Sequence, residues 1–503
     1  MQSLIKINEA DNVAVALRDL KKGEWVKAAG EAILLQEDIA RGHKVALCNM
    51  EEGFEVIKYG FPIGHLKQPV SAGAHIHTHN LQTNLSDVLE YEYHPKVAAN
   101  QMPCGTAKQA ANEEAYFMGY ERADQRAGIR NELWIIPTVG CVNSIAKELA
   151  QQGSALLGGN LDGIVALTHP YGCSQMGEDQ ENTRKALAAL VHHPNAGGVL
   201  VLGLGCENSH IEVLKEYIGD YETERVKFLQ CQDVEDEIEE GLSLLKELAV
   251  YASKCRRTKV SVQKLVVGLK CGGSDGLSGI TANPTVGQFS DLVVAAGGST
   301  ILTEVPEMFG AETILMERAQ NRAVFDKTVS LINDFKAYFQ SHNQTIYENP
   351  SPGNKAGGIS TLEDKALGCT QKSGSAPVVD VLAYGEKLQR SGLNLLYAPG
   401  NDLVASTALA LSGAQIILFT TGRGTPFASV VPTVKISTNT KLAEKKKDWI
   451  DFDCGRLLDE GLGMEALGKE LYEYVLAVAG GEKVKSEKSD YKELAIWKGG
   501  VTL

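Results

Sequence analysis

The 503-residue chain lacks any uninterrupted apolar run of the roughly 18 residues that a membrane-spanning helix needs. Its opening residues, MQSLIKINEADN, lack the apolar centre of a secretory signal peptide. Basic side chains are outnumbered, with 49 Lys and Arg against 63 Asp and Glu, and the net charge of -14 opposes nonspecific binding to nucleic acid or anionic lipid. We therefore expect a cytoplasmic protein that has neither nucleic acid nor membrane as its partner.

Two common catalytic signatures are also missing. The sequence contains no Walker phosphate loop and no His-Glu-x-x-His pair, which disfavours ATP hydrolysis and metalloprotease chemistry. None of the ten cysteines forms a Cys-x-x-Cys pair. In a long chain without a signal peptide, thiols are expected in the core or as metal ligands rather than in disulfides.

The chain divides into a β-rich part and an α/β part. Short apolar runs separated by glycine turns predict a small all-β module over residues 1–94, and residues 95–130, without a strand pattern, are predicted to be a connector. Beyond it, strand-like runs alternate with helical stretches, which predicts βαβ units and parallel sheets. We assign residues 131–297 to a first α/β domain and residues 298–503 to a second, which ends in a helical tail.

Three Gly-Cys pairs each follow a predicted strand of the first α/β domain. Their cysteines are Cys141, Cys173 and Cys206, and Cys271 follows the next such strand. Because the carboxyl ends of parallel strands share one edge of a sheet, we expect these thiols to gather on one rim. Convergent thiolates hold iron, zinc or an iron–sulfur cluster. The alternative is that each cysteine packs as a small apolar side chain at the end of its strand.

An alternating histidine motif, His-Ile-His-Thr-His, ends the β module at residues 75–79. In an extended strand, side chains two residues apart point to the same face, so the three imidazoles would lie side by side. Two of them, predicted to be His77 and His79, would then be close enough to share a metal ion. The alternative is a polar, solvated strand face.

The remaining candidates lie on glycine-rich loops and one strand-to-helix turn. His169 and Tyr171 lie in the segment THPYGCSQ, where His169 is a candidate general base or ligand. The loops CGGSDGLSG, PSPGNKAGG and GRGT contribute Ser274, Asp275, Asn354, Lys355 and Arg423. Exposed amides together with a lysine or an arginine suit a carboxylate and several hydroxyl groups.

Long segments of the chain resemble the family of altronate and galactarate dehydratases and sulfolactate sulfo-lyase. They include VIKYGFPIG, HIHTHN, RNELWIIPTVGCVN, THPYGCSQ, HPNAGGVLVLGLGCEN, TEVPEMFGAE, YENPSPGNKAGGISTLEDKALGCTQK and ELAIWKGGVTL. A further match is to the family segment ECGGSDGLSGITANP, whose first residue is replaced by Lys270 in this chain. The resemblance runs from near residue 11 to the last residue and implies that the β module is a SAF (β-clip) domain.

The resemblance also implies an activity and a cofactor. The implied reaction is the conversion of D-altronate to 2-keto-3-deoxy-D-gluconate and water, by a hydro-lyase of hexuronate catabolism that requires iron(II), with manganese sometimes effective. Galactarate dehydration and sulfite elimination from sulfolactate are the alternatives within the family. Fusion of the β module to the α/β region argues against the sulfo-lyase, whose two parts are separate subunits. A noncatalytic carbohydrate-binding protein is an alternative of a different class.

The candidate residues and the resemblance lead to one hypothesis for the site. Dehydration removes a weakly acidic proton beside the carboxylate, so charge that builds up there must be neutralised by a cation or by fixed donors. We predict iron on the three rim cysteines, either as a single ion or as a labile four-iron–four-sulfur cluster, with His77 and His79 reaching in from the β module. His169 is the predicted acid/base, with Tyr171 beside it. Lys355 and Arg423 are predicted to bind the carboxylate, and Ser274, Asp275 and Asn354 to contact substrate hydroxyls. The partner is a small sugar acid, and the enzyme is expected to form homo-oligomers.

Overall fold

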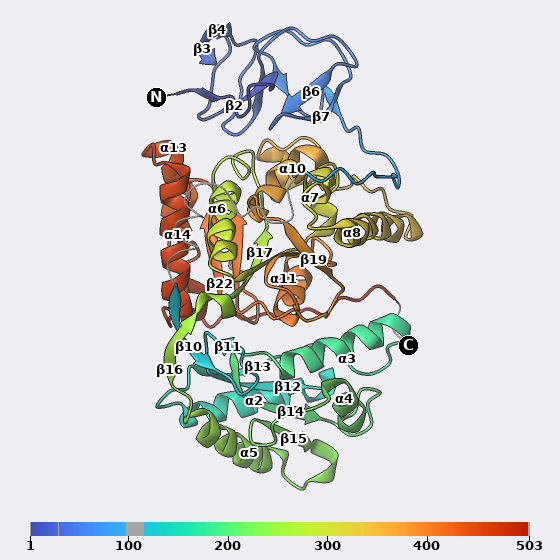
Figure 1. Cartoon of the computed structure of the whole chain (residues 1–503), viewed down its shortest axis with the longest axis vertical. Helices are drawn as coiled ribbons and strands as arrows, with labels where there is room; N and C mark the ends of the chain where they lie inside the picture. The colour runs from blue at the N-terminus through green and yellow to red at the C-terminus, as the bar shows by residue number, and fades with distance from the viewer. Residues whose placement is uncertain (1, 29, 97–114, 501–503) are drawn as a thin grey trace.

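The computed structural model describes residues 2–28, 30–96 and 115–500, and it shows three units stacked along one axis (Figure 1). A β module lies at one end, a seven-stranded sheet with its helices lies in the middle, and a four-stranded sheet with its helices lies at the other end. The predicted fold class, a β module followed by an α/β region with parallel sheets, is confirmed. Across the described residues, every helix is too short or too polar to cross a membrane.

The β module is built from three small antiparallel sheets of strand order β1-β2-β5-β8, β3-β4 and β6-β7-β9. The strands are β1 (Leu4–Ile5), β2 (Val13–Ala16), β3 (Trp25–Ala28), β4 (Glu31–Leu34), β5 (Lys44–Ala46), β6 (Glu55–Lys58), β7 (Phe61–Leu66), β8 (His75–Ile76) and β9 (Leu81–Gln82). The side chains of one small apolar core, among them Leu20, Val26 and Ile39, come from the module itself. A second core joins Val56 and Ile63 to Ala366 and Leu367 of the seven-stranded unit, so the module is packed onto that unit.

The four-stranded sheet is parallel and has the order β13-β12-β14-β15. Its elements are β12 (Glu132–Pro137), α2 (Asn143–Gly153), β13 (Gly163–Ala166), α3 (Gly177–Val191), β14 (Ala196–Gly203), α4 (Ile211–Ile218), β15 (Val226–Gln230) and α5 (Glu237–Ala252). Helices α2 and α5 cover one face and α3 and α4 cover the other. The central strand β14 is buried along its whole length, which explains its uninterrupted apolar sequence.

The second part of the predicted connector, residues 95–130, contains strands. Residues 97–114 lie outside the described residues, but β10 (Tyr116–Glu121) and β11 (Ala127–Gly128) follow them. They form an antiparallel sheet with β16 (Arg257–Ser261), which follows the four-stranded unit in the chain. Tyr116 pairs with Ser261 in this sheet. Because β10 pairs with a strand far along the chain, the local sequence of residues 95–130 gives no sign of this pairing.

The seven-stranded sheet is parallel, with the order β19-β20-β18-β17-β21-β22-β23. Its strands are β17 (Val266–Cys271), β18 (Ser299–Leu302), β19 (Val378–Leu382), β20 (Gly392–Leu396), β21 (Ile416–Thr421), β22 (Thr433–Ser437) and β23 (Phe452–Asp453). The sequence assigned β17 to the first α/β domain, whereas the structure places it at the centre of this sheet. The alternation of strands and helices continues without a break at residue 262, so spacing alone does not show where one sheet ends.

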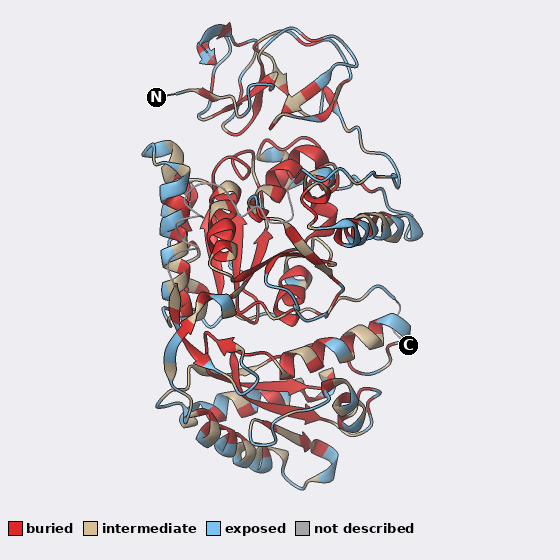
Figure 2. Ribbon diagram, viewed as in Figure 1, coloured by how far each residue is buried: buried red, intermediate tan, exposed pale blue. Residues whose placement is uncertain are grey.

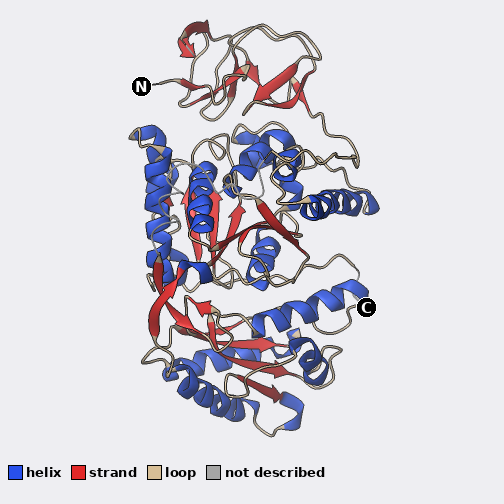
Figure 3. Cartoon of the chain, viewed as in Figure 1, coloured by secondary structure: helices blue, strands red, loops and turns tan. Residues whose placement is uncertain are grey.

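Helices surround this sheet on both faces. They are α6 (Ala282–Ala295), α7 (Glu312–Met316), α8 (Arg322–Ser341), α9 (Pro352–Ala356), α10 (Leu362–Thr370), α11 (Asp402–Leu411), α12 (Thr440–Lys445), α13 (Arg456–Asp459), α14 (Met464–Ala479) and α15 (Lys485–Lys488). Helices α7 and α8 are separate, because the Asn321 side chain accepts a hydrogen bond from Val324 N and caps the start of α8. Helices cover both α/β sheets, and buried residues fill the space between them (Figures 2 and 3).

Candidate active site

The β module covers the carboxyl edge of the seven-stranded sheet, the edge at which open α/β sheets bind ligands (Figure 1). The loops that follow β17 and β21 lie at this edge, together with the segment 350–361. Hydrogen bonds from His43, Lys44 and His77 join the module to this segment. The candidate site therefore lies between two units, and both must be in place to form it.

A buried charge cluster holds the β module on this edge. Lys44 and Lys58 of the module bind the two carboxylate oxygens of Asp364 at 2.7 and 2.9 Å, and the exposed fractions of the three side chains are 0–2%. Lys44 also donates to the carbonyl oxygen of Gly358 at 2.8 Å. Burial lowers the pKa of Lys44 to about 8, and nearby Asp364 acts in the opposite direction. The two lysines hold the pKa of Asp364 far below its usual range despite burial.

Backbone also approaches backbone closely at this contact. A Cβ atom added at Gly276 would lie 1.9 Å from the carbonyl oxygen of Gly42, and one at Gly358 would lie 2.3 Å from the same atom. Gly276 N donates to Gly357 O at 2.7 Å, which holds the two loops of the seven-stranded unit together below Gly42. Only glycine fits at these positions without displacing the module.

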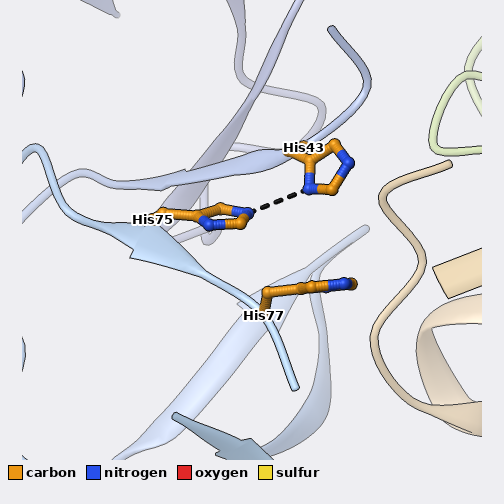
Figure 4. A group of neighbouring side chains, drawn as sticks. All are labelled: His43, His75 and His77. Carbon is orange, nitrogen blue, oxygen red and sulfur yellow. Dashed lines mark hydrogen bonds between the residues drawn. The ribbon is translucent and has the colours of Figure 1, made fainter. Parts of the chain in front are cut away.

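Three histidines of the β module meet beside this contact. His43 precedes β5, His75 begins β8, and His77 follows β8; the antiparallel pairing of β5 with β8 brings them together (Figure 4). His43 Nδ1 lies 2.9 Å from His75 Nε2, and the ring centroids of the three side chains are 5.0–5.4 Å apart. One ligand atom from each residue lies within 4.8 Å of the other two. The arrangement has the geometry of a metal site.

Neighbouring groups orient these rings. His43 Nε2 lies 3.3 Å from the carbonyl oxygen of Ala356; because a carbonyl only accepts, Nε2 carries the proton and Nδ1 keeps its lone pair. His77 Nδ1 hydrogen-bonds with Ser360 Oγ at 2.8 Å. Burial lowers the pKa of His75 to about 3 and that of His77 to about 4, with the nearby positive charges acting in the same direction. Imidazoles kept neutral in this way have the protonation state that a divalent transition metal needs.

The structure brings only part of the predicted metal set together. His77 is one of the three grouped histidines, but His79 is not, because the chain turns after His77: Asn80 N donates to His77 O, and Asn80 Oδ1 accepts from His77 N. The strand period that aligned the motif ends there, and His79 is exposed on the turn, with its ring centroid 5.4 Å from that of His75. The rim cysteines do not join the histidines, because they lie on the four-stranded sheet at the opposite end of the molecule (Figure 1).

The predicted acid/base pair is also separated from the carboxylate-binding residues. His169 follows β13 of the four-stranded sheet and is buried, with Nε2 2.8 Å from Pro137 O and Nδ1 accepting from Tyr171 N at 3.2 Å. Burial lowers the pKa of His169 to about 4 and raises the pKa of the half-buried Tyr171. His169 thus holds a turn together within its own unit, while Lys355 and Arg423 lie on loops of the seven-stranded unit.

The structure brings the glycine-rich loops close to one another. Asn354 Nδ2 donates to Ser274 O at 2.8 Å, and Arg423 Nη1 donates to Gly353 O at 3.3 Å. Lys355 is next to Ala356, the residue whose carbonyl faces His43. Asp275 is half-buried and accepts from Thr438 Oγ1 at 2.9 Å and from Ser278 Oγ at 3.1 Å, so its carboxylate fixes the loop.

A buried charged network underlies these loops. Lys365 binds Glu307 at 2.7 Å and also donates to Asn354 Oδ1 at 3.3 Å. Cys271 and Cys369 each lie against Glu307, at 3.1 and 3.2 Å, and the three ligand atoms form a second compact group. Burial would raise the pKa of Glu307, but Lys365, Lys270 and Lys372 more than offset it and keep the pKa low. Because lysines already neutralise this carboxylate, the group does not favour a further cation. Cys271, which the sequence placed with the rim cysteines, belongs here.

Sequence reasoning did not single out His43 or Arg41, and it left His75 out of the predicted metal set. His43 lies in an apolar strand segment 32 residues before His75, and only the pairing of β5 with β8 joins them. Arg41 is half-buried at the same contact, and among the described residues its buried Nε atom finds no hydrogen-bond partner. Arg41 lies close enough to Asp275 to lower the pKa of that carboxyl against the effect of burial.

Comparison with known proteins agrees with this architecture. Family models match all three units: the altronate/galactarate dehydratase SAF domain at residues 2–84, the second domain of D-galactarate dehydratase/altronate hydrolase at 119–253, and the C-terminal part of D-galactarate/altronate dehydratase at 262–502. Altronate dehydratase of Bacillus subtilis (strain 168) is 56% identical over 505 residues, which is 100% of both chains. The chain belongs to this family.

Two further relatives show how identity varies within the family. Altronate dehydratase of Escherichia coli (strain K12) is 53% identical over 503 residues, with 99% of each chain covered. Galactarate dehydratase (L-threo-forming) of the same strain is 33% identical over 501 residues, covering 95% of this chain and 93% of the relative. The family prediction made from the sequence is thereby confirmed, including its SAF domain.

Proposed function

We propose that this protein is an altronate dehydratase, a hydro-lyase that converts D-altronate to 2-keto-3-deoxy-D-gluconate and water. The observation that carries the proposal is the identity of 56% and 53% to two altronate dehydratases over practically the whole chain, against 33% to a galactarate dehydratase. Its cytoplasmic location, its assembly into homo-oligomers and the bounds of its domains stay predictions of the sequence.

We place the reaction between the β module and the seven-stranded sheet, with iron(II) on His43, His75 and His77. Three neutral imidazoles with grouped donor atoms fit such an ion. When bound, it supplies a Lewis acid that stabilises negative charge on oxygen. The hydrogen bonds to Ala356 and Ser360 orient two of the rings from the opposite unit, so they align the site only when the module is docked.

The chain itself supplies three cationic side chains around this centre. Lys355 and Arg423 come from the loops of the seven-stranded unit, and Arg41 comes from the β module. Loss of the proton beside the carboxylate increases the negative charge there, and fixed guanidinium and ammonium groups lower its free energy. Arg41 has an unused buried donor and lies two residues from His43, so we assign it to the substrate carboxylate.

Replacement of Arg41 by alanine is expected to raise the KM for D-altronate about 10- to 100-fold, because a hydrogen bond to a charged group contributes about 1.5–3 kcal/mol. Arg41→Lys should recover only part of this loss, since lysine lacks the planar, two-pronged donor set. Arg18→Ala is the matched control, because Arg18 is an arginine of the same module that pairs with Glu24 at the surface. An unchanged KM in Arg41→Ala would remove Arg41 from the site.

The substrate is tested with anaerobically purified full-length protein, assayed for keto-acid formation from D-altronate and from galactarate, with and without added iron(II). We expect turnover of D-altronate that depends on iron. Turnover of galactarate alone would retain the chemistry and change the substrate. Tight binding of either sugar acid without turnover would favour the noncatalytic carbohydrate-binding protein.

A further inference from the structure

The three rim cysteines are all exposed, although free cysteine is among the residue types most often buried. Cys141, Cys173 and Cys206 follow β12, β13 and β14, which are adjacent in the four-stranded sheet. By contrast, the other cysteines at strand ends in the described α/β units, Cys231, Cys271 and Cys454, are buried. Packing of apolar side chains therefore does not explain the rim thiols.

Hydrogen bonds hold the three cysteine turns against one another. Gly140 N donates to Tyr171 O at 2.9 Å, and Ser209 N donates to Gly172 O at 3.2 Å. Ser174 N donates to Asn208 Oδ1 at 3.0 Å. The turn with Cys173 is thus bonded on one side to the turn with Cys141 and on the other side to the turn with Cys206.

Buried side chains fix the shape of these turns. Gly172 has a φ of +104°, and a Cβ atom there would lie 1.9 Å from the carbonyl oxygen of Thr138. The Glu207 carboxylate accepts from Gly205 N at 2.7 Å and from Leu204 N at 3.1 Å. Asn143 Nδ2 donates to His169 O at 2.9 Å. Each thiol is therefore presented on a backbone that is rigid before any ligand arrives.

Polar atoms around the rim are buried without a partner. Asn143 Oδ1, Arg184 Nε and Ser209 Oγ are buried and have no hydrogen-bond partner among the described residues. Asn143 is two residues from Cys141, and Ser209 is three residues from Cys206. Arg184 reaches the third turn, because its Nη2 donates to Asn208 O at 2.9 Å. These atoms have almost no exposed surface, so a ligand at the rim would meet the three exposed thiols rather than these atoms.

The grouping of donor atoms disfavours one ion shared by all three sulfurs. Around one tetrahedral ion, bonds of about 2.3 Å bring sulfurs to within roughly 4 Å of one another. Among the described residues, the sets of donors that all lie within 4.8 Å of one another do not include the rim cysteines. An iron–sulfur cube binds each thiolate on a different iron, so it spaces them more widely.

We propose that Cys141, Cys173 and Cys206 bind a four-iron–four-sulfur cluster, which is a second metal centre on a different sheet from the histidine site. Three thiolates leave the fourth iron without a protein sulfur, so that iron is open to an oxygen ligand. This proposal does not rest on the assigned substrate, because the cluster is measured without turnover.

The test uses the full chain, reconstituted anaerobically with iron(II) and sulfide. We expect about four irons and four labile sulfides per chain beyond the histidine-bound ion, with the visible absorption of iron–sulfide bonds, which bleaches on reduction. Cys141→Ser, Cys173→Ser and Cys206→Ser should each lose the labile sulfide and the visible band. Cys48→Ser is the matched control, because Cys48 is an exposed cysteine of the β module.

Further variants separate this centre from the histidine site and from misfolding. His77→Ala should keep its labile sulfide and lose only the single iron. Cysteine-to-alanine variants with the far-ultraviolet circular dichroism of the parent must show the same loss as the serine variants. Three results would each overturn the proposal. The parent protein could bind iron without labile sulfide, or it could bind a single thiophilic ion that the rim variants lose. The third such result is labile sulfide that the rim variants retain.

Discussion

Replacing His77 with alanine is expected to lower D-altronate turnover by at least about 100-fold, because even residues that only support a metal ligand contribute 10- to 100-fold. His77 is one of three imidazoles whose ligand atoms lie within 4.8 Å of one another. The remaining two nitrogens hold an ion weakly and leave it poorly oriented. The measurements are kcat/KM for D-altronate and iron content after anaerobic dialysis.

Two neighbouring variants sharpen this test. His79→Ala removes an exposed imidazole of the same sequence motif, and it should retain most of the turnover, since the structure leaves His79 out of the group. Ser360→Ala removes the hydroxyl that hydrogen-bonds His77 Nδ1, and it should cause a smaller loss than His77→Ala. Equal losses in His77→Ala and His79→Ala would support the pair His77 and His79 predicted from the sequence. They would contradict the site formed by His43, His75 and His77.

The elements that the sequence predicted well are those with a strong local period. Helix α5, for example, begins where the Asp236 side chain accepts from Ile238 N and Glu239 N, and its apolar residues recur at the helical period. Strands β10 and β16 were missed because each is stabilised mainly by the other, across more than 130 residues of chain. The order of strands in a sheet is likewise set by packing between distant segments.

The same distinction explains the outcome at the two candidate centres. Three cysteines after three strands of one βαβ series predicted a shared rim, and the strands are indeed adjacent. Whether that rim faces the β module depends on how the two α/β units pack, and no local pattern encodes this. His43 meets His75 through a pairing of β5 with β8, so the motif at 75–79 showed only part of the histidine site.

Replacing Asp364 with asparagine is expected to detach the β module from the seven-stranded unit. Asp364 is the only carboxylate bound by Lys44 and Lys58 among the described ion pairs, and all three side chains are buried. Its loss leaves two buried ammonium groups unpaired, and removing one partner of a buried pair costs about 3–5 kcal/mol. Turnover should fall with the docking, because Lys44 is next to His43. Thermal unfolding and hydrogen exchange in strands β5 and β8 measure the two effects.

Asp38→Asn is the matched control, since Asp38 pairs with Lys21 at 2.7 Å on the surface of the same module, where the side chains are 60% and 76% exposed. Exposed pairs contribute about 0–1 kcal/mol, so this variant should unfold like the parent. The triple variant Lys44→Met, Lys58→Met, Asp364→Leu tests the cause, because it removes the charges together. It should recover much of the stability, but not all, because Gly358 O and Ser360 N lose their partners. A triple variant as unstable as Asp364→Asn would show that shape rather than unpaired charge holds the module in place.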